Sequence, residues 1–324
     1  MITKKINWVF FGSSEFSVYV LDELKIHNIL PSLIITTPDK PKGRKLVLTP
    51  TPVKIWAKEN NIEVIEPASL KNNPNLISQL KALSSELFLV ASYGKIIPPE
   101  VFEIPKHKTL NIHPSLLPKY RGASPIQSQI LEDAQEVGVS IMKIDEGMDT
   151  GAIVVQRKIE FFPSQAHKCT DIFLLENSSC SAQSASQGIS ELATSRTLWP
   201  LGRKELEKHL AIEGARLFAH ILPEWLIGAI DPIMQRETEA TYCQKIKKED
   251  GELKIDLENL EKNAHENLLK IKAFEEWPTA YFFLNNKRII ITDAMIEDNK
   301  LKILKVKPEG KNEMSFEDFL RGQR

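Results

Sequence analysis

The sequence predicts a doubly wound α/β domain with a mostly parallel sheet, followed by a smaller second domain. Short apolar runs alternate with helical segments over the first half of the chain, which is the pattern of repeated βαβ units. The run at residues 87–91 (LFLVA) is apolar throughout, as is typical of a strand buried on both faces of a parallel sheet. From Tyr242 onward the pattern changes to one helical segment and three short alternating runs. The second domain is therefore expected to be part helix and part β-barrel or curled sheet.

The first expected strand, residues 6–11, is followed by Ser13 and Ser14, either of which can cap a helix because its hydroxyl accepts from free backbone amides. Glu15 then lies in the first turn, where the helix dipole favours an anion. In the first domain, the other expected strands cover residues 33–37, 63–65, 87–91, 110–113, 138–144 and 152–162, and the other expected helices cover residues 53–59, 127–133 and 204–222. In the second domain, a helix is expected over residues 257–274 and strands over residues 281–284, 287–292 and 301–306.

Local composition divides the chain into parts. Residues 164–203 are rich in Ser, Ala, Gln and Thr without sustained periodicity, so this segment is expected to be an irregular or mobile insertion. An ordinary surface loop with one short helix is the alternative. Residues 229–240 contain proline and polar residues without an apolar period and are expected to form a linker. The expected domains are therefore residues 1–228, which include the insertion, and residues 241–324.

The overall composition indicates a globular protein in a reducing compartment. The formal net charge is -1, so contact with a nucleic acid would have to come from local clusters of Lys and Arg. Cys169, Cys180 and Cys243 form no CxxC pair, which argues against a disulfide framework. No apolar stretch reaches the length of a membrane span, and the apolar run near the N-terminus is too short for a signal peptide. We expect a cytoplasmic protein, and nothing in the sequence demands more than a monomer.

Residues 111–118 (NIHPSLLP) carry the strongest chemical signal. In an extended strand, Asn111 and His113 point to the same face, roughly 6.5 Å apart. The amide of Asn111 can donate to a carbonyl oxygen, and the imidazole of His113 can give or take a proton near neutral pH. Leu116 and Leu117 can line one wall of an apolar pocket, in which exposed backbone groups of the loop bond a flat heterocycle.

A carboxylate that can orient the imidazole follows in residues 146–151 (EGMDTG). Asp149 lies between glycines there, in a loop whose backbone can approach a ligand closely. An Asn–His–Asp set suits acyl transfer to an amine, because donors stabilise the developing oxyanion and a base removes the proton of the amine. Each feature by itself has a plainer explanation: a lone histidine at a strand end is more often structural, and a single DTG lacks the second carboxylate of an aspartic protease. Neither a nicotinamide cofactor nor a metal is expected, since GxGxxG, HExxH and paired cysteines are all missing from the sequence.

Residues 111–122, together with Pro125-Ile126 and Asp149-Thr150-Gly151, closely resemble the folate-dependent formyltransferases. The resemblance covers nearly the whole chain. Further segments are similar to the members of this family that formylate a charged initiator tRNA, namely residues 11–16 (FGSSEF), 37–45, 50–54, 91–98, 242–247, 271–278 and 316–322. Residues 164–203 have no counterpart in the family, and they lie downstream of all three catalytic candidates.

The resemblance implies a Rossmann-like first domain, a second domain that resembles an OB barrel, and transfer of a formyl group from 10-formyltetrahydrofolate to the methionine amine of the charged initiator tRNA. It implies that Asn111, His113 and Asp149 are the catalytic set. In the mechanism that we expect, Asn111 and His113 donate to the formyl oxygen, while Asp149 fixes the imidazole and helps to take the proton of the amine. The implied folate-binding residues are Tyr93, Gly94, Ile96, Ser115, Leu116, Leu117 and Pro118.

Two basic clusters are expected to contact the phosphates of tRNA. They consist of Lys42, Arg44 and Lys45, in an expected loop at residues 38–45, and of Lys245, Lys247 and Lys248. A bare charge run of this kind is usually a solvated surface, but its place at the ligand edge of the sheet and the resemblance favour tRNA. Two alternatives stay open: the same folate chemistry on a small amine (a nucleotide sugar or glycinamide ribonucleotide) or on water, and a folate-binding protein without turnover. The basic loop and the second domain favour tRNA, since a small acceptor needs neither.

Overall fold

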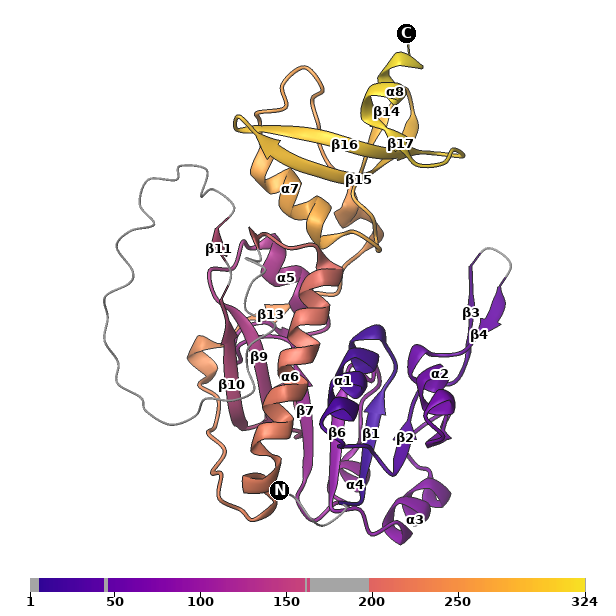
Figure 1. The fold of residues 1–324 in the computed structure, drawn as a ribbon, viewed down its shortest axis with the longest axis vertical. Helices are drawn as coiled ribbons and strands as arrows, with labels where there is room; N and C mark the ends of the chain where they lie inside the picture. The colour runs from indigo at the N-terminus through magenta and orange to yellow at the C-terminus, as the bar shows by residue number, and fades with distance from the viewer. Residues whose placement is uncertain (1–5, 44–45, 161, 164–197, 324) are drawn as a thin grey trace, which may run out of the picture. The chain divides into compact units, whose positions relative to one another are not determined.

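The computed structural model describes residues 6–43, 46–160, 162–163 and 198–323 (Figure 1). The chain forms two compact units. The first consists of Met1–Ile159 with Lys204–Asp250, and the second consists of Glu160–Arg203 with Gly251–Arg324. Residues 164–197, which make up most of the expected insertion, lie outside the described residues. None of the described helices is both long enough and apolar enough to cross a membrane.

Seven strands form the sheet of the first unit: β1 (Trp8–Gly12), β2 (Leu33–Ile35), β5 (Glu63–Ile65), β6 (Leu87–Ala91), β7 (Thr109–His113), β9 (Val137–Lys143) and β10 (Ile153–Ile159). Their order across the sheet is β10-β9-β7-β6-β1-β2-β5 (Figure 1). The strands from β7 to β5 are parallel, whereas β9 is antiparallel to β7 and β10 is antiparallel to β9. The mostly parallel sheet that the sequence predicts is confirmed.

The described helices of this unit are α1 (Glu15–Ile26), α2 (Pro52–Glu59), α3 (Pro74–Ala82), α4 (Pro99–Phe102), α5 (Pro125–Leu131) and α6 (Arg203–Leu226). On one face of the sheet, α6 lies beside α1 (Figure 1). Phe218 of α6 packs against Trp8 of β1, and Arg216 of α6 lies 2.8 Å from Glu23 of α1. On the other face, α3 and α4 close an apolar core that includes Phe11, because residues of opposite parity on a strand point to opposite faces. The sheet is therefore covered on both sides, as in other doubly wound folds.

Helix α6 extends beyond its expected end near Leu222 and passes through Pro223 to Leu226. The last turn is held by Trp225, which is buried and donates from Nε1 to the carbonyl oxygen of His107 at 2.9 Å. The helix-breaking tendency of Pro223 is therefore overridden by packing that local sequence does not reveal.

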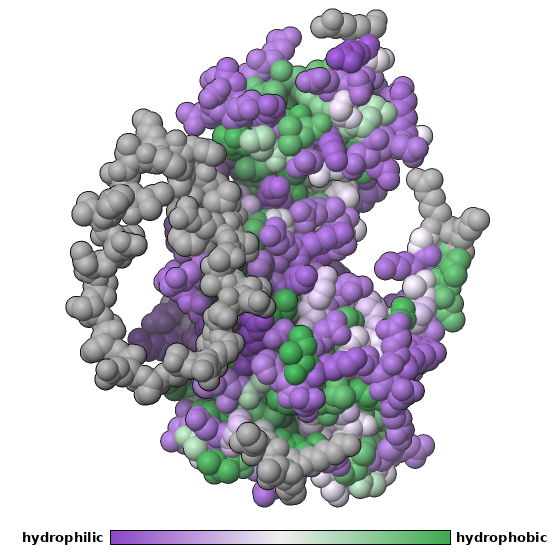
Figure 2. Space-filling view, in the orientation of Figure 1, coloured by the Kyte–Doolittle hydropathy of each residue, from purple (hydrophilic) through white to green (hydrophobic). Residues whose placement is uncertain are grey.

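Residues 38–45 were expected to form a loop, and this expectation is wrong. They contribute to a hairpin of β3 (Lys40–Lys42) and β4 (Val47–Thr49), in which the two strands are antiparallel. Gly43 lies in the turn with a φ of +73°, which glycine adopts at little cost. The sequence does not predict strand β3, because Lys-Pro-Lys has no apolar alternation and contains a proline. Residues 46–48 are exposed and apolar, and Figure 2 shows this patch beside hydrophilic neighbours.

Two short parallel pairs complete the described strands outside the second sheet: β8 (Arg121–Gly122) pairs with β13 (Tyr242–Cys243), and β11 (Phe162–Pro163) pairs with β12 (Leu198–Trp199). Two 3-10 turns, η1 (Glu237–Glu239) and η2 (Lys248–Gly251), follow α6. The β8–β13 pair brings the chain after α6 back against the loop that leaves β7.

The second unit contains an antiparallel sheet of β14 (Tyr281–Leu284), β15 (Lys287–Glu297), β16 (Lys300–Pro308) and β17 (Met314–Ser315), with helices α7 (Ala264–Ala273) and α8 (Phe316–Arg321). The helix that was expected from residue 257 begins only at Ala264, because Asn263 before it adopts a left-handed conformation (φ +56°). Strand β15 is longer than expected and shifts its register between Ile291 and Asp293, as a β-bulge does. The expected small domain of helix and sheet is confirmed, with an antiparallel sheet.

Candidate active site

Strand β7 places Asn111 and His113 at its carboxyl end, on the same face of the strand. Ile112 between them points to the opposite face, where it lies against Gly214 of α6. His113 is buried and Asn111 is half-buried. Among the residues that the structure describes, none bonds the side-chain amide of Asn111. This amide is therefore available to a carbonyl oxygen of a ligand.

The ring of His113 lies between two oxygen atoms. Its Nδ1 is 3.6 Å from Oδ1 of Asp149, which is within ion-pair distance but too long for a strong hydrogen bond. Its Nε2 is 3.0 Å from the carbonyl oxygen of Tyr120. Both neighbours are acceptors, but only an N–H at Nε2 is at hydrogen-bond distance from its neighbour, whereas an N–H at Nδ1 faces the carboxylate of Asp149 at 3.6 Å. The imidazole ring and the carboxylate thus face each other, with side chains that are 5% and 19% exposed.

Asp149 is held by the main chain around it. Its Oδ2 accepts from the N–H of Gly122 at 2.8 Å, and its own φ is +57°, a left-handed conformation that Asp tolerates better than most residues. Oγ1 of Thr150 donates to Oδ1 of Asp145 at 2.8 Å. A Cβ at Gly151 would lie 1.8 Å from a main-chain oxygen of β9, so only glycine fits there. The loop therefore fixes the carboxylate by backbone conformation as well as by side-chain contacts.

The loop after β7 is fastened to β9 and β10 by hydrogen bonds. Oγ of Ser140 accepts from the N–H of Leu117 at 3.0 Å and donates to the carbonyl oxygen of Ser115 at 2.6 Å. Gln156 donates to the carbonyl oxygen of Leu117 at 2.8 Å. Backbone groups that were expected to face a heterocycle are thus used within the protein. The loop offers a ligand chiefly the apolar side chain of Leu116, which is half-buried over β9, whereas Leu117 is buried in the protein.

The segment after β6 divides between core and surface. The ring of Tyr93 is 2% exposed and packs edge-on against Phe11, with ring centroids 5.6 Å apart. Burial raises the pKa of Tyr93 to about 12, and its hydroxyl has no hydrogen-bond partner among the described residues. Ile96 is 87% exposed, and Gly94 is exposed with a φ of +76°. From this segment, a ligand can therefore reach Gly94, Ile96 and main-chain groups, but not the ring of Tyr93.

The described residues of the two basic clusters are all exposed: Lys42 on β3, and Lys245, Lys247 and Lys248 after β13. Arg44 and Lys45 lie outside the described residues. At the base of the β3–β4 hairpin, Nζ of Lys54 lies 2.8 Å from a carboxylate oxygen of Asp39 and 2.8 Å from one of Glu66. The hydrogen bond from Lys54 is the main cause that lowers the pKa of Asp39. The hairpin is thus tied to α2 at its start.

Residues of the expected linker, residues 229–240, contact the segment that follows β7. Local sequence patterns do not predict these contacts. The buried guanidinium of Arg121 donates from Nε to Gln235 at 3.0 Å, and from Nη1 to Glu237 at 2.8 Å and to the hydroxyl of Tyr242 at 2.7 Å. These partners lie 114 to 121 positions after Arg121 in the chain, so no motif or period joins them to it. The segment therefore belongs to the surroundings of the site.

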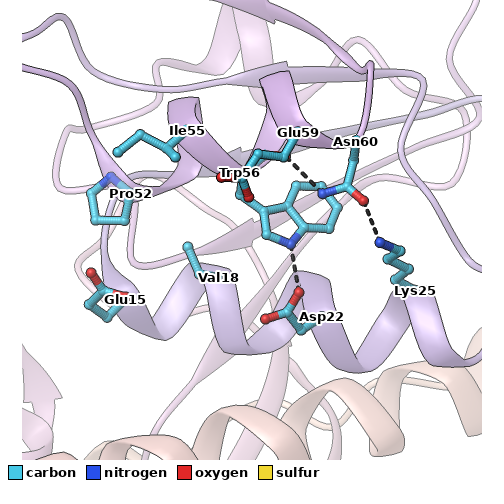
Figure 3. Close-up of a pocket in the computed structure, with 9 residues that line it drawn as sticks. All are labelled: Glu15, Val18, Asp22, Lys25, Pro52, Ile55, Trp56, Glu59 and Asn60. Carbon is cyan, nitrogen blue, oxygen red and sulfur yellow. Dashed lines mark hydrogen bonds between the residues drawn. The ribbon is translucent and has the colours of Figure 1, made fainter.

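A separate groove of about 430 Å³ lies between α1 and α2 (Figure 3). Nε1 of Trp56 donates to Oδ1 of Asp22 at 2.6 Å, and Nζ of Lys25 donates to Oδ1 of Asn60 at 2.6 Å across it. None of the predicted site residues lines this groove. These two hydrogen bonds join the two helices to each other.

The sequence profile of the formyl transferase family matches residues 4–171. A methionyl-tRNA formyltransferase of Sulfurihydrogenibium sp. is 35% identical over 91% of this chain and 82% of its own length. The methionyl-tRNA formyltransferase of Dictyoglomus turgidum is 32% identical over 98% of this chain and 96% of its own length. Similarity to these proteins thus extends through both units of the fold.

Solved structures share the fold at lower identity. The methionyl-tRNA formyltransferase from Clostridium thermocellum matches 94% of this chain and 98% of its own, with a TM-score of 0.53 and 19% identity. HypX from Aquifex aeolicus in complex with tetrahydrofolic acid matches 98% of this chain and 47% of its own, with a TM-score of 0.58 and 14% identity. A sugar N-formyltransferase from Shewanella sp. matches 91% of this chain and 100% of its own, with a TM-score of 0.57 and 14% identity. At these identities the likeness shows the fold alone.

Proposed function

The chain belongs to the formyl transferase family, and from this premise we propose that it transfers the formyl group of 10-formyltetrahydrofolate to the amino group of methionine on a charged initiator tRNA. The relatives that support this acceptor are named methionyl-tRNA formyltransferases and are 31–35% identical over 91–98% of the chain. The structural observation that carries the proposal is the unbonded amide of Asn111 beside the pair of His113 and Asp149.

The chemistry requires two kinds of group, and the site offers both. As the amine nitrogen attacks the formyl carbon, negative charge develops on the formyl oxygen, to which the amide of Asn111 donates. His113 is the second donor, and its Nε2–H must then be shared with, or turned from, the carbonyl oxygen of Tyr120 at 3.0 Å. Asp149 fixes the imidazole and accepts the proton that the amine loses. The bond from the formyl carbon to the folate nitrogen then breaks, and that nitrogen gains the proton that the amine had given to Asp149, so no net proton is lost.

The folate donor is proposed to lie against the loop of Ser115, Leu116, Leu117 and Pro118 and the segment of Tyr93, Gly94 and Ile96. The half-buried Leu116 and the exposed Ile96 provide apolar surface for a flat ring. Tyr93 contributes through its main chain, since its ring lies in the core. The structural likeness to HypX, which was solved with tetrahydrofolic acid, is consistent with this class of ligand.

Exposed lysines favour tRNA over a small acceptor. Lys42 is carried on the β3–β4 hairpin, and the cluster of Lys245, Lys247 and Lys248 lies in the same unit of the fold. Such clusters are suited to phosphates. Sugar formyltransferases have the same fold, so formylation of a small amine is the competing function. Arg44 and Lys45 are proposed to belong to the first cluster.

A comparison of the transfer rates to different acceptors tests the proposal. The purified protein is incubated with 10-formyltetrahydrofolate and, separately, with charged initiator methionyl-tRNA, an amino sugar nucleotide, glycinamide ribonucleotide, or water alone. The proposal predicts formyl-methionine on the tRNA at a rate far above that with the small acceptors. Faster transfer to a small amine or to water would assign the folate chemistry to that acceptor instead. Binding of the folate without transfer to any acceptor would indicate a binding protein.

A further inference from the structure

Gln235 joins the segment after α6 to the loop that carries Asp149. Its side-chain NH₂ group donates to the carbonyl oxygen of Asp149 at 2.8 Å and to that of Gly151 at 2.7 Å. The amide group thus holds the main chain on both sides of Thr150, and both of its N–H donors are used. Ile233 bonds the same segment to Ile153, just after the loop, through two main-chain hydrogen bonds of 2.8 Å.

Arg121 holds Gln235 in its turn. Its Nε donates to Oε1 of Gln235 at 3.0 Å, and its side chain is only 1% exposed, so its donors must be bonded within the protein. Glu237 accepts from Nη1, and this hydrogen bond lowers the pKa of Glu237, so the carboxylate stays charged at neutral pH. The residue after Arg121, Gly122, donates directly to Oδ2 of Asp149. Strand β8 therefore acts on Asp149 in two ways. The backbone of Gly122 bonds its carboxylate, and the side chain of Arg121 holds Gln235, which bonds its loop.

We propose that Gln235 is a positioning residue for Asp149. By fixing the carbonyl groups of Asp149 and Gly151, its amide sets the distance and direction of the carboxylate relative to His113. The backbone of Asp149 is in the sparsely populated left-handed region, which neighbouring contacts must maintain. The reaction step for which this matters rests on the proposed function, whereas the contacts themselves do not.

Gln235 lies outside the part of the chain that contains the catalytic candidates. The family profile ends at residue 171, and Gln235 lies beyond it, in the segment that was expected to be a linker. The first part of the chain thus contributes all three catalytic candidates, while the loop that carries one of them is fastened from outside that part. A protein cut before this segment would keep Asn111, His113 and Asp149 but lose the restraint on the carboxylate.

The kinetic test compares Gln235→Leu, which keeps the size of the side chain but has no donor, with Gln235→Glu, which can still accept from Arg121 but cannot donate to carbonyl groups. Both variants are expected to lower kcat by about 10- to 100-fold, the effect of misplacing a catalytic group by about 1 Å, with KM for the folate changed by less than about 2-fold. Met234→Ala, at an exposed neighbour in the same segment, is the matched control and should keep normal kcat. Normal kcat in both Gln235 variants would overturn the proposal.

A double-mutant comparison asks whether Gln235 acts through Asp149. In single-turnover reactions, Gln235→Leu should slow the wild-type background strongly and the Asp149→Asn background hardly at all, because the group that it positions is already lost. An equal fold-change in the two backgrounds would mean that Gln235 acts elsewhere, and the positioning role would be wrong.

A spectroscopic readout separates this inference from the proposed function. The ring of His113, labelled with ¹³C, should change its NMR signal at fixed pH in Gln235→Leu and keep it in Met234→Ala. If wild-type protein formylates no acceptor but the His113 signal still moves, the function is wrong and the positioning role stands. If wild-type protein is active and neither kcat nor the His113 signal responds to Gln235→Leu, the positioning role is wrong and the function stands.

Discussion

Gly214 of α6 lies directly against Ile112, the residue that separates Asn111 from His113 on β7. A Cβ at position 214 would stand 2.4 Å from Cγ2 of Ile112 and 3.1 Å from Cγ2 of Val139. The glycine therefore lets α6 approach the strand that carries the site, at the point where the strand must be held in place.

We expect Gly214→Ala to destabilise the protein by about 1–3 kcal/mol, because the added methyl group overpacks the contact between helix and sheet. Urea unfolding measures the change. Part of the loss should disappear when Ile112→Ala makes room for the methyl group, so the two substitutions should not be additive. Additive losses would show that the methyl group does not meet Ile112.

Tyr93→Phe should stabilise the protein by roughly 1 kcal/mol near neutral pH, because it removes a buried hydroxyl that has no partner among the described residues. The raised pKa of Tyr93, about 12, adds a dependence on pH. A raised pKa gives stability that is fully present below the ordinary value of 10.0 and is lost as the pH rises through the folded value. Thermal unfolding between pH 9 and about 12 should therefore decline less steeply in the variant. KM for the folate should not change, and a large rise in KM would show that the hydroxyl reaches the donor.

Lys54→Met should reduce the dependence of stability on acid. Because Lys54 lowers the pKa of Asp39, this pair stabilises the protein above the ordinary pKa of 3.8 and the stabilisation is lost as the pH falls through the lowered value. The variant should be less stable than wild type at pH 7 and should lose less on acidification. Lys81→Met, at an exposed lysine of α3, serves as the control in the same thermal unfolding series. An unchanged acid profile in Lys54→Met would contradict the role of the ion pair.

Lys42→Ala should weaken binding of tRNA and lower the slope of log affinity against log salt concentration by about one unit, if Lys42 contacts one phosphate. Titrations between roughly 50 and 200 mM salt measure both effects. Lys81→Ala should leave the slope as it is, since this lysine belongs to neither basic cluster. A wild-type affinity that does not fall with added salt would remove the basic clusters from the tRNA interface.

The strands at the centre of the sheet can be predicted from the sequence because they are continuous apolar runs. Strands β1 and β6 are five-residue apolar runs, buried along their whole length. The hairpin strand Lys40–Lys42 carries no such pattern, since it packs into no core and its residues are exposed. The last turn of α6 follows Pro223, and the hydrogen bond from Trp225 to the carbonyl oxygen of His107, far away in the sequence, helps to hold it. Elements whose conformation depends on contacts with distant parts of the chain therefore cannot be predicted from the local sequence pattern.

The candidate site divides in the same way. The i, i+2 spacing of Asn111 and His113 predicts their common face from strand geometry alone. The approach of Asp149 to His113 was inferred from chemistry and from resemblance, and the structure gives the distance of 3.6 Å. The contacts of Arg121 and Gln235 depend on how a segment after α6 returns to the sheet, which no short motif encodes.

The most direct test of the central claim is single-turnover formylation of charged initiator methionyl-tRNA by wild type and by Asn111→Asp, with folate binding and thermal unfolding measured on the same samples. Because aspartate is isosteric with asparagine but cannot donate when ionised, the proposed mechanism predicts a fall in the transfer rate of about 100-fold or more. Folate binding and the unfolding midpoint should stay close to those of wild type. Transfer at a nearly normal rate by Asn111→Asp would contradict the assignment of this site as the place where the formyl oxygen is stabilised.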